Sequence, residues 1–195
     1  MIIQFVRHME TDMNRLGIIQ GSSDGLLGEI GQAQSRLFVE EKDLSDIDVV
    51  YCSNLSRAKF LAGLIKDKIH KELIIDERLN EIHVGQWEGK TWKEVTVEYK
   101  DFLEGWFKDN TNIPAPDGES YAELAIRLHA FIEDIKKLDY KKVMVIAHGA
   151  VIKTLICSML DIDLKNRSKF VIDNGSITEF IFSKNKVVVS KINSK

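Results

Sequence analysis

The stretch IIQFVRH, residues 2–8, gives the strongest indication of the fold. Its first five residues form a strand-length run with almost no alternation of apolar and polar side chains, which is typical of a strand buried on both faces of a parallel sheet. Arg7 and His8 follow at once. In open α/β sheets, ligands bind just beyond the carboxyl ends of the strands. The stretch therefore predicts a buried strand and, directly after it, a functional position.

Three further runs, 49–52, 73–75 and 143–147, have the same character and also end in polar residues. Because parallel strands end at one edge of their sheet, the residues that follow them should converge there. We expect the imidazole of His8 to be exposed at this edge. The expected set contains two histidines, two arginines and a carboxylate, namely His8, His148, Arg7, Arg57 and Glu81.

Segments with helical periodicity separate these runs. Apolar residues recur at helical spacing over 121–138, preceded by Ser120 as an N-cap, and again over 58–69. The ranges 177–182 and 187–192, with four residues between them, predict a hairpin. Alternating β and α units predict an α/β fold, a three-layer α/β/α arrangement with a mainly parallel sheet.

A chain of 195 residues predicts a single domain, 1–195, with an inserted helical and aromatic segment at about 82–116. That segment holds all three tryptophans, Trp87, Trp92 and Trp106, and it ends in a proline-containing stretch that cannot continue a helix. Its aromatic side chains fit two roles equally well. They form either a small separate core or the wall of a substrate pocket.

Composition excludes several classes of protein. With 44% hydrophobic and 29% charged residues, the chain can bury a core, which argues against intrinsic disorder. A net charge of -3 provides no overall positive field for a nucleic-acid backbone or an anionic membrane. We therefore expect neither a nucleic-acid nor a membrane partner, and any anionic ligand must be bound by a few local cations.

The two cysteines and the apolar stretches indicate the cellular compartment of the protein. Cys52 and Cys157 form no paired-ligand spacing and no disulfide framework, which fits a reducing compartment. The N-terminal stretch lacks the features of a signal peptide. The most apolar later stretch, 143–160, is interrupted by His148 and Lys153, so it is a poor membrane span. A soluble cytoplasmic protein is predicted.

The residues at the sheet edge are chemically compatible with phosphoryl transfer. Two guanidinium groups can grip phosphoryl oxygens, an imidazole can attack phosphorus, and a carboxylic acid can protonate the departing oxygen. A metal site built from His8, Glu10, Glu81 and His83 is the competing use, but the sequence has no HxH or HxxxH pair and the arginines would repel a dication. Nucleotide-binding glycine loops are also missing from the sequence. Neither a metal nor a cofactor is expected.

Several motifs carry a resemblance to a known family. Residues 7–11, RHMET, with Asn14, resemble the RHG-type signature of the histidine phosphatase superfamily, which includes phosphoglycerate mutases and many small phosphatases. The chain resembles the family in order over nearly its whole length, through the segments QG (20–21), SNLSRA (53–58), LNE (79–81), GES (118–120), AHG (147–149) and NGSIT (174–178).

The resemblance implies a phosphoglycerate mutase-like fold and a role for each residue. His8 would be the nucleophile that becomes phosphohistidine, and Glu81 would be the acid and base. Arg7, Arg57 and His148 would surround the phosphoryl oxygens. Further hydrogen-bond donors would come from Asn14 and from the N–H of Gly149 at a helix start.

The sequence departs from the family pattern at Met9, which replaces a glycine and could narrow the pocket, and at Asn54, which replaces a proline. The stretch GQWEGKTW, residues 85–92, resembles the phosphatase branch. The resemblance thus implies a metal-independent phosphatase acting on small phosphomonoesters. The alternatives are a phosphoglycerate mutase and a non-catalytic phosphate-binding module. Sugar phosphates, phosphoglycerate, phosphoserine and α-ribazole phosphate all remain candidate substrates, and the oligomeric state is open.

Overall fold

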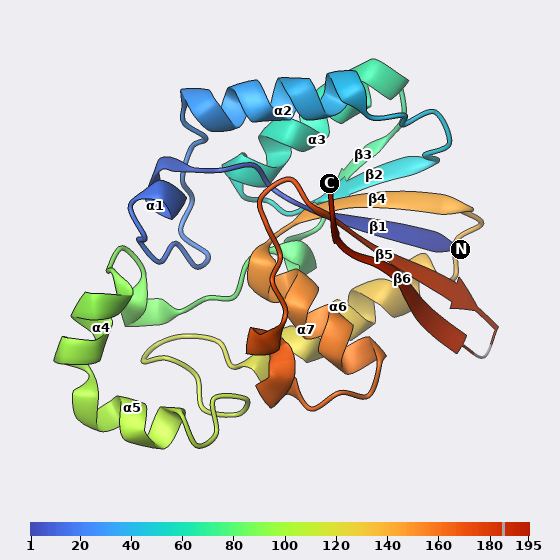
Figure 1. Cartoon of the computed structure of the whole chain (residues 1–195). Coiled ribbons are helices and arrows are strands. Elements are labelled where there is room, and N and C mark those ends of the chain that lie inside the picture. The colour runs from blue at the N-terminus through green and yellow to red at the C-terminus, as the bar shows by residue number, and fades with distance from the viewer. Residues whose placement is uncertain (185) are drawn as a thin grey trace.

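The computed structural model describes residues 1–184 and 186–195, and a six-stranded sheet of order β3-β2-β4-β1-β5-β6 lies at its centre (Figure 1). Four neighbouring strands are parallel, and β5 pairs antiparallel with both of its neighbours, β1 and β6. The strands are β1 (Ile2–Arg7), β2 (Val49–Cys52), β3 (Leu73–Ile75), β4 (Lys142–Ala147), β5 (Ile177–Ser183) and β6 (Lys186–Ser194). The predicted α/β fold with a mainly parallel sheet is confirmed.

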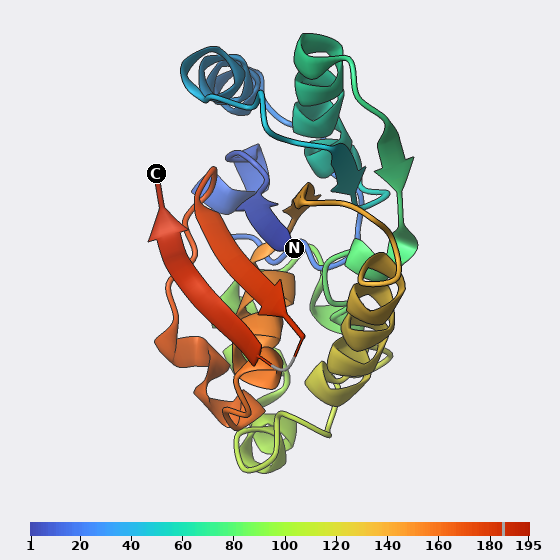
Figure 2. The same ribbon diagram turned by 90° about the vertical axis from the view of Figure 1, so that its right-hand side faces the viewer.

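Helices cover both faces of the sheet, as Figure 2 shows from the side. Helices α2 (Glu29–Glu41) and α3 (Ser56–Ile69) lie on one face, and α6 (Tyr121–Ile135) and α7 (Gly149–Met159) lie on the other. Each face has its own core. The consecutive residues Phe5 and Val6 are both fully buried, Phe5 in the core under α6 and α7 and Val6 in the core under α2 and α3. This is why the run in β1 shows no polar alternation.

Local signals explain where α6 begins. The Ser120 hydroxyl accepts a hydrogen bond from the Glu123 N–H, and the Glu123 carboxylate accepts one from the Ser120 N–H, which completes a capping box. The predicted helix ran to Leu138, and this end was wrong. The helix ends at Ile135, and the side chain of Leu138 is exposed because it lies beyond the face that packs on the sheet.

The predicted strands agree with the structure to within two residues at each end, and 49–52 and 73–75 agree fully. The turn predicted at 183–186 contains residue 185, which lies outside the described residues. The short helix α1 (Asp12–Arg15) and the 3₁₀ helices Glu77–Leu79 and Leu164–Lys169 were not predicted. In the described part of the chain, no helix has the length and apolar character needed to cross a membrane.

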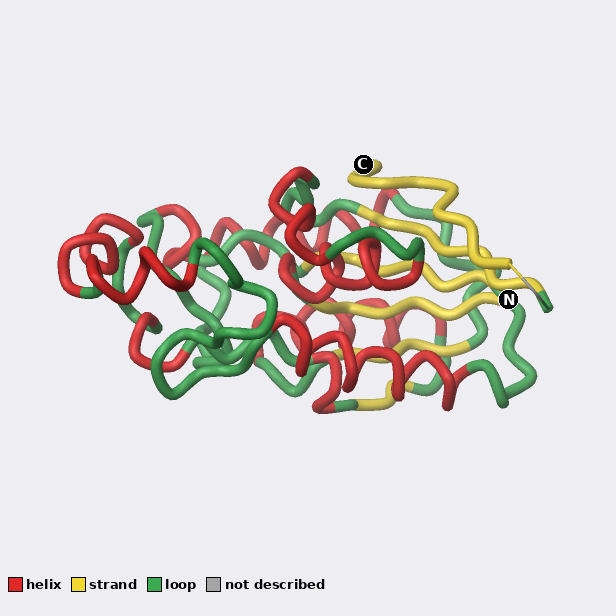
Figure 3. The backbone as a smooth tube through the Cα atoms, turned by 90° about the horizontal axis from the view of Figure 1, so that it is seen from below, coloured by secondary structure: helices red, strands yellow, loops and turns green. Residues whose placement is uncertain are grey.

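Segment 82–116 lies beyond the carboxyl ends of the parallel strands, away from the sheet (Figure 3). It contains a 3₁₀ helix (Gly85–Trp87) and two short helices, α4 (Trp92–Glu98) and α5 (Lys100–Trp106). Trp87 is buried in a small core with Val95, Leu103 and Ala115. The segment is tied to the loop after β1, because Ile18 and Thr91 form an antiparallel β-bridge and the backbone of Ile19 hydrogen-bonds to Lys90 and Gly89.

Candidate active site

The parallel register of β1 and β4 brings the two histidines together. Arg7 pairs with Ala147, so the next residues, His8 and His148, leave the sheet side by side, and their ring centroids are 5.1 Å apart. The chain continues from β1 to α2 on one face and from β4 to α7 on the other. The histidines therefore lie at a topological switch point, where open α/β sheets form their binding sites.

His8 is held in one tautomer. Its Nδ1 lies 2.7 Å from the carbonyl oxygen of Met9, and because a carbonyl can only accept, Nδ1 carries the proton and donates it. Burial, helped by the neighbouring charges of Arg57 and Arg7, lowers the pKa of His8 to about 3. The ring is therefore neutral at physiological pH, and its Nε2 keeps a free electron pair. The expectation of an exposed imidazole was wrong, because only 3% of His8 is exposed.

His148 lies fully buried behind His8. Its Nε2 is 2.6 Å from the hydroxyl oxygen of Ser53, which itself accepts a hydrogen bond from the N–H of Leu55. Burial, followed by the influence of His8 and the arginines, holds the pKa of His148 well below its usual value. Its Nδ1 is buried and has no hydrogen-bond partner within the described ranges 1–184 and 186–195. A neutral ring with one uncommitted nitrogen is thus available beside His8.

Arg7 and Arg57 both line a cavity of about 260 Å³ in front of His8. Arg7 donates from one terminal nitrogen to the carbonyl of Ile172. Arg57, only 1% exposed, donates to the carbonyls of Ser23 and Gly21, and so fixes the loop that closes this cavity. The Nε atoms of both arginines are buried without a partner among the described residues. Buried unpaired donors are costly, so an anion in this cavity would be stabilised.

Glu81 lines the same cavity and also a second, larger pocket. One carboxylate oxygen accepts from the N–H of Ile82 and the other accepts from the N–H of Ala150, at 3.0 and 3.1 Å. Arg127 binds the backbone carbonyl of Glu81 and forms a two-bond ion pair with Glu119. The backbone and the carboxylate of Glu81 are therefore both held in place.

The remaining predicted residues lie at the same site. Asn14 lines the cavity in front of His8, and its side-chain oxygen accepts from Thr11 and Asn174. Gly149 is the first residue of α7 and lines the larger pocket, where a Cβ would meet the Arg7 side chain at 3.5 Å. All seven predicted site residues are thus brought to one edge of the sheet.

Met9 does not line the cavity. Its side chain is buried in the core under α2 and α3, and its backbone lacks the positive φ that would favour glycine. Gly175 makes room for it, because a Cβ there would lie 2.7 Å from the Met9 sulfur. The replacement of glycine is therefore absorbed by the core. Within the described residues, no group of three His, Cys, Asp or Glu side chains is placed to hold a metal ion.

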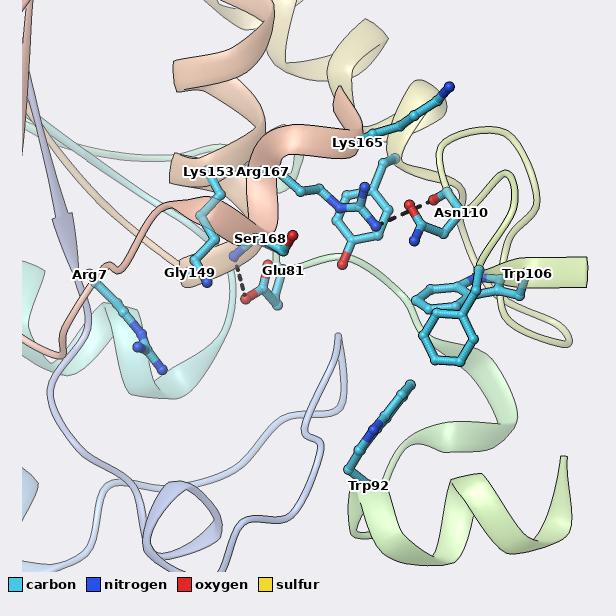
Figure 4. A pocket seen from close by; sticks show the side chains of 13 residues that line it. Arg7, Glu81, Trp92, Trp106, Asn110, Gly149, Lys153, Lys165, Arg167 and Ser168 are labelled. Atoms are coloured by element: carbon cyan, nitrogen blue, oxygen red, sulfur yellow. Dashed lines mark hydrogen bonds between the residues drawn. The ribbon is translucent and has the colours of Figure 1, made fainter. Parts of the chain in front are cut away.

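A second pocket of about 550 Å³ opens next to the His8 cavity, and the two share Arg7, Glu81 and Tyr121 (Figure 4). Trp92, Trp106 and Phe107 form its aromatic wall. The tryptophans of segment 82–116 therefore divide between a small separate core and the wall of a pocket. Trp87 belongs to the small core, whereas Trp92 and Trp106 also face the pocket.

This division predicts different effects of two matched substitutions. Trp87→Ala should lower the stability by about 3–5 kcal/mol, because it leaves a cavity in a buried cluster. Trp106→Ala should change the ranking of substrates in a phosphomonoester panel, because it opens the pocket wall. Thermal melts and the panel, measured for both variants, test this. A Trp106→Ala protein with an unchanged ranking would show that the wall does not contact substrate.

Sequence reasoning missed several polar residues at this site. Ser53 and Asn174 lie within recognised motifs, and they position His148 and the backbone of His8. Lys153 lies four residues after Gly149 on α7, so helical spacing could have indicated it. Arg167 comes from a short 3₁₀ helix and had no signal in the sequence.

Comparisons with known proteins agree with this geometry. A model of the histidine phosphatase superfamily (branch 1) matches residues 3–195. Phosphoserine phosphatase 1 of Hydrogenobacter thermophilus is 30% identical over 189 residues, covering 96% of this chain and 90% of that protein. A protein of Photorhabdus laumondii named "Probable phosphoglycerate mutase GpmB" is 28% identical, covering 90% and 82%.

Among solved structures, a phosphoserine phosphatase of Entamoeba histolytica in complex with 3-phosphoglyceric acid superposes with a TM-score of 0.85. It is 32% identical, and the match covers 100% of this chain and 97% of that chain. The resemblance inferred from the motifs is thereby confirmed. The chain belongs to the histidine phosphatase superfamily, in its branch 1.

Proposed function

We propose that the protein is a metal-independent phosphatase that hydrolyses small phosphomonoesters through a phosphohistidine on His8. The observation that carries the proposal is the neutral His8 ring, fixed through Nδ1 to the Met9 carbonyl, next to two arginines and a carboxyl group. The family membership and relatives named phosphoserine phosphatases support hydrolysis. Two free, buried cysteines are compatible with a cytoplasmic location, which we also propose.

In the first step, Nε2 of His8 attacks phosphorus. The bond between phosphorus and the leaving oxygen breaks, and this oxygen takes a proton from the Glu81 carboxyl group. Arg7, Arg57 and Nδ1 of His148, which carries the proton when the Ser53 hydroxyl donates to Nε2, stabilise the charge on the non-bridging oxygens. Asn14 and the Gly149 N–H are further donors. The Met9 carbonyl stabilises the positive charge on the phosphorylated ring through Nδ1–H.

In the second step, water attacks the phosphohistidine. Glu81, now a carboxylate, takes a proton from the water, and the phosphorus–nitrogen bond breaks with its electron pair returning to Nε2. Inorganic phosphate leaves and the neutral His8 is restored. A phosphoglycerate mutase would differ only here, because a hydroxyl group of bound substrate would take the phosphoryl group in place of water.

The proposal predicts phosphate release that does not need a metal ion. Purified protein should release phosphate from p-nitrophenyl phosphate at the same rate with and without EDTA. The same preparation should be given 3-phosphoglycerate, with both phosphate and 2-phosphoglycerate measured.

Each alternative has its own result in these assays. Formation of 2-phosphoglycerate with little free phosphate would identify a mutase. Binding of inorganic phosphate without turnover of any ester would identify a phosphate-binding module. A rate that collapses in EDTA and returns with added metal would overturn metal independence.

A further inference from the structure

We propose that the larger pocket holds a second anionic group of the substrate, bound by Lys153 and Arg167. The preferred substrates would then be phosphomonoesters whose leaving group carries a carboxylate or a second phosphate. This inference rests on the proposed function, because it places the phosphoryl group at His8 and the rest of the substrate next to Glu81.

Arg167 is a buried cation that forms no ion pair within the described residues. It is 6% exposed, and its guanidinium carbon lies 3.4 Å from the centre of the Tyr121 ring. In the described part of the chain, its terminal nitrogens donate to the backbone carbonyls of Leu164 and Asn110, at 2.9 and 3.5 Å. No carboxylate within the described residues is in ion-pair distance of it. A stacked, rigid guanidinium is well suited to bind a carboxylate or phosphate.

Lys153 is the second such cation. It lies on α7, one turn after Gly149, and its half-buried side chain lines the pocket between Arg7 and Arg167 (Figure 4). In the described part of the chain, its ammonium group forms neither an ion pair nor a hydrogen bond. Burial and the nearby Arg7 lower the pKa of Lys153, while Glu81 opposes the shift. A bound anion would relieve this unfavourable environment.

The site holds more positive charges than are needed to neutralise a phosphoryl group. Arg7 and Arg57 match the two negative charges of a phosphomonoester. Lys153 and Arg167 remain, and among the described residues that line the larger pocket the only carboxylate is Glu81. Because Glu81 must be protonated when the leaving group departs, it cannot neutralise either cation in that step. A second anion on the substrate would balance them.

The dimensions of the pocket agree with a leaving group of this kind. The two cavities meet at Arg7, Glu81 and Tyr121, so a substrate bound to His8 extends past Glu81 into the larger one. Trp92 and Trp106 line the larger pocket as well, and they give the carbon skeleton an apolar surface to contact. Lys165 lies further out, with its side chain 64% exposed and an ion-pair partner in Asp163.

The test compares 3-phosphoglycerate with glycerol 3-phosphate, which share a skeleton and differ in one carboxylate. The wild-type kcat/KM should favour 3-phosphoglycerate by at least about tenfold. Lys153→Met and Arg167→Met should each reduce this ratio by about tenfold or more. Lys169→Met, which removes an exposed charge on the same 3₁₀ helix as Arg167 but outside the pocket lining, should change it by less than about threefold.

A second pair, fructose 1,6-bisphosphate and fructose 6-phosphate, separates a phosphate from a carboxylate as the preferred anion. Thermal melts identify any loss of folding in Arg167→Met, and Lys153→Met tests the site independently. Equal slowing of both members of each pair, or a wild-type ratio near one in both pairs, would overturn the inference.

If the protein is not a phosphatase, these assays give a different result from the one that overturns the anion site. A wild-type protein that hydrolyses neither these esters nor p-nitrophenyl phosphate would refute phosphatase activity. Because Trp92 and Trp106 line the larger pocket, a titration followed by tryptophan fluorescence would still report whether 3-phosphoglycerate binds more tightly than glycerol 3-phosphate. Preferential binding that is lost in Lys153→Met would support the anion site, and equal binding would overturn it.

Discussion

The His8→Ala variant is expected to lose at least about a thousandfold of the wild-type phosphatase rate, equivalent to about 4 kcal/mol in the barrier. The reason is that the proposed phosphohistidine cannot form without Nε2 of this ring. The other donors at the site would still bind phosphate. The measurement is kcat/KM with p-nitrophenyl phosphate, together with the binding of inorganic phosphate.

Two controls make this result specific. Because His8 is buried, Ala could also loosen the fold, so His8→Asn, which fills more of the space, should be measured alongside it with thermal melts. His129→Ala, on the exposed face of α6, should keep the wild-type rate. A folded His8→Ala protein that retains more than about a tenth of the rate would show that another group is the nucleophile.

Glu81→Gln should slow phosphorylation of His8 to an extent that depends on the leaving group, whereas the attack of water acts on the same phosphohistidine for every substrate. An amide cannot donate the proton that an alkoxide needs, so phosphorylation by an alkyl phosphate should slow by at least about a hundredfold. A p-nitrophenolate leaves without this help, so phosphorylation by p-nitrophenyl phosphate should slow by less than about tenfold. Pre-steady-state bursts of product measure this step separately from the attack of water.

Glu81→Gln keeps the size of the side chain but breaks one of its two backbone hydrogen bonds, so thermal melts should accompany the kinetics. Both carboxylate oxygens accept hydrogen bonds from backbone N–H groups, and the amide oxygen of Gln can keep one of them. Glu133→Gln, an exposed carboxylate on α6, serves as the matched control. Equal slowing with both substrates would mean that Glu81 holds the structure of the site and does not transfer the proton.

Much of the fold follows from local physical chemistry. The unbroken apolar runs of β1, β2 and β4 indicated strands buried on both faces, and the capping box at Ser120 fixed the start of α6. These signals depend only on neighbouring residues, so one sequence is enough to recognise them. The end of α6 depended on where the sheet stops supporting it, and this was missed.

The features of the candidate site likewise fall into those that local sequence predicts and those that depend on tertiary packing. Local sequence patterns place His8, His148, Arg7, Arg57 and Glu81 at or after the ends of strands, and parallel pairing necessarily brings strand ends to one edge. The burial of His8 and the placement of Met9 in the core became visible in the folded chain, and so did the fact that Lys153 and Arg167 share one pocket. Burial and charge pairing depend on packing between segments far apart in the chain, and no local pattern encodes that packing.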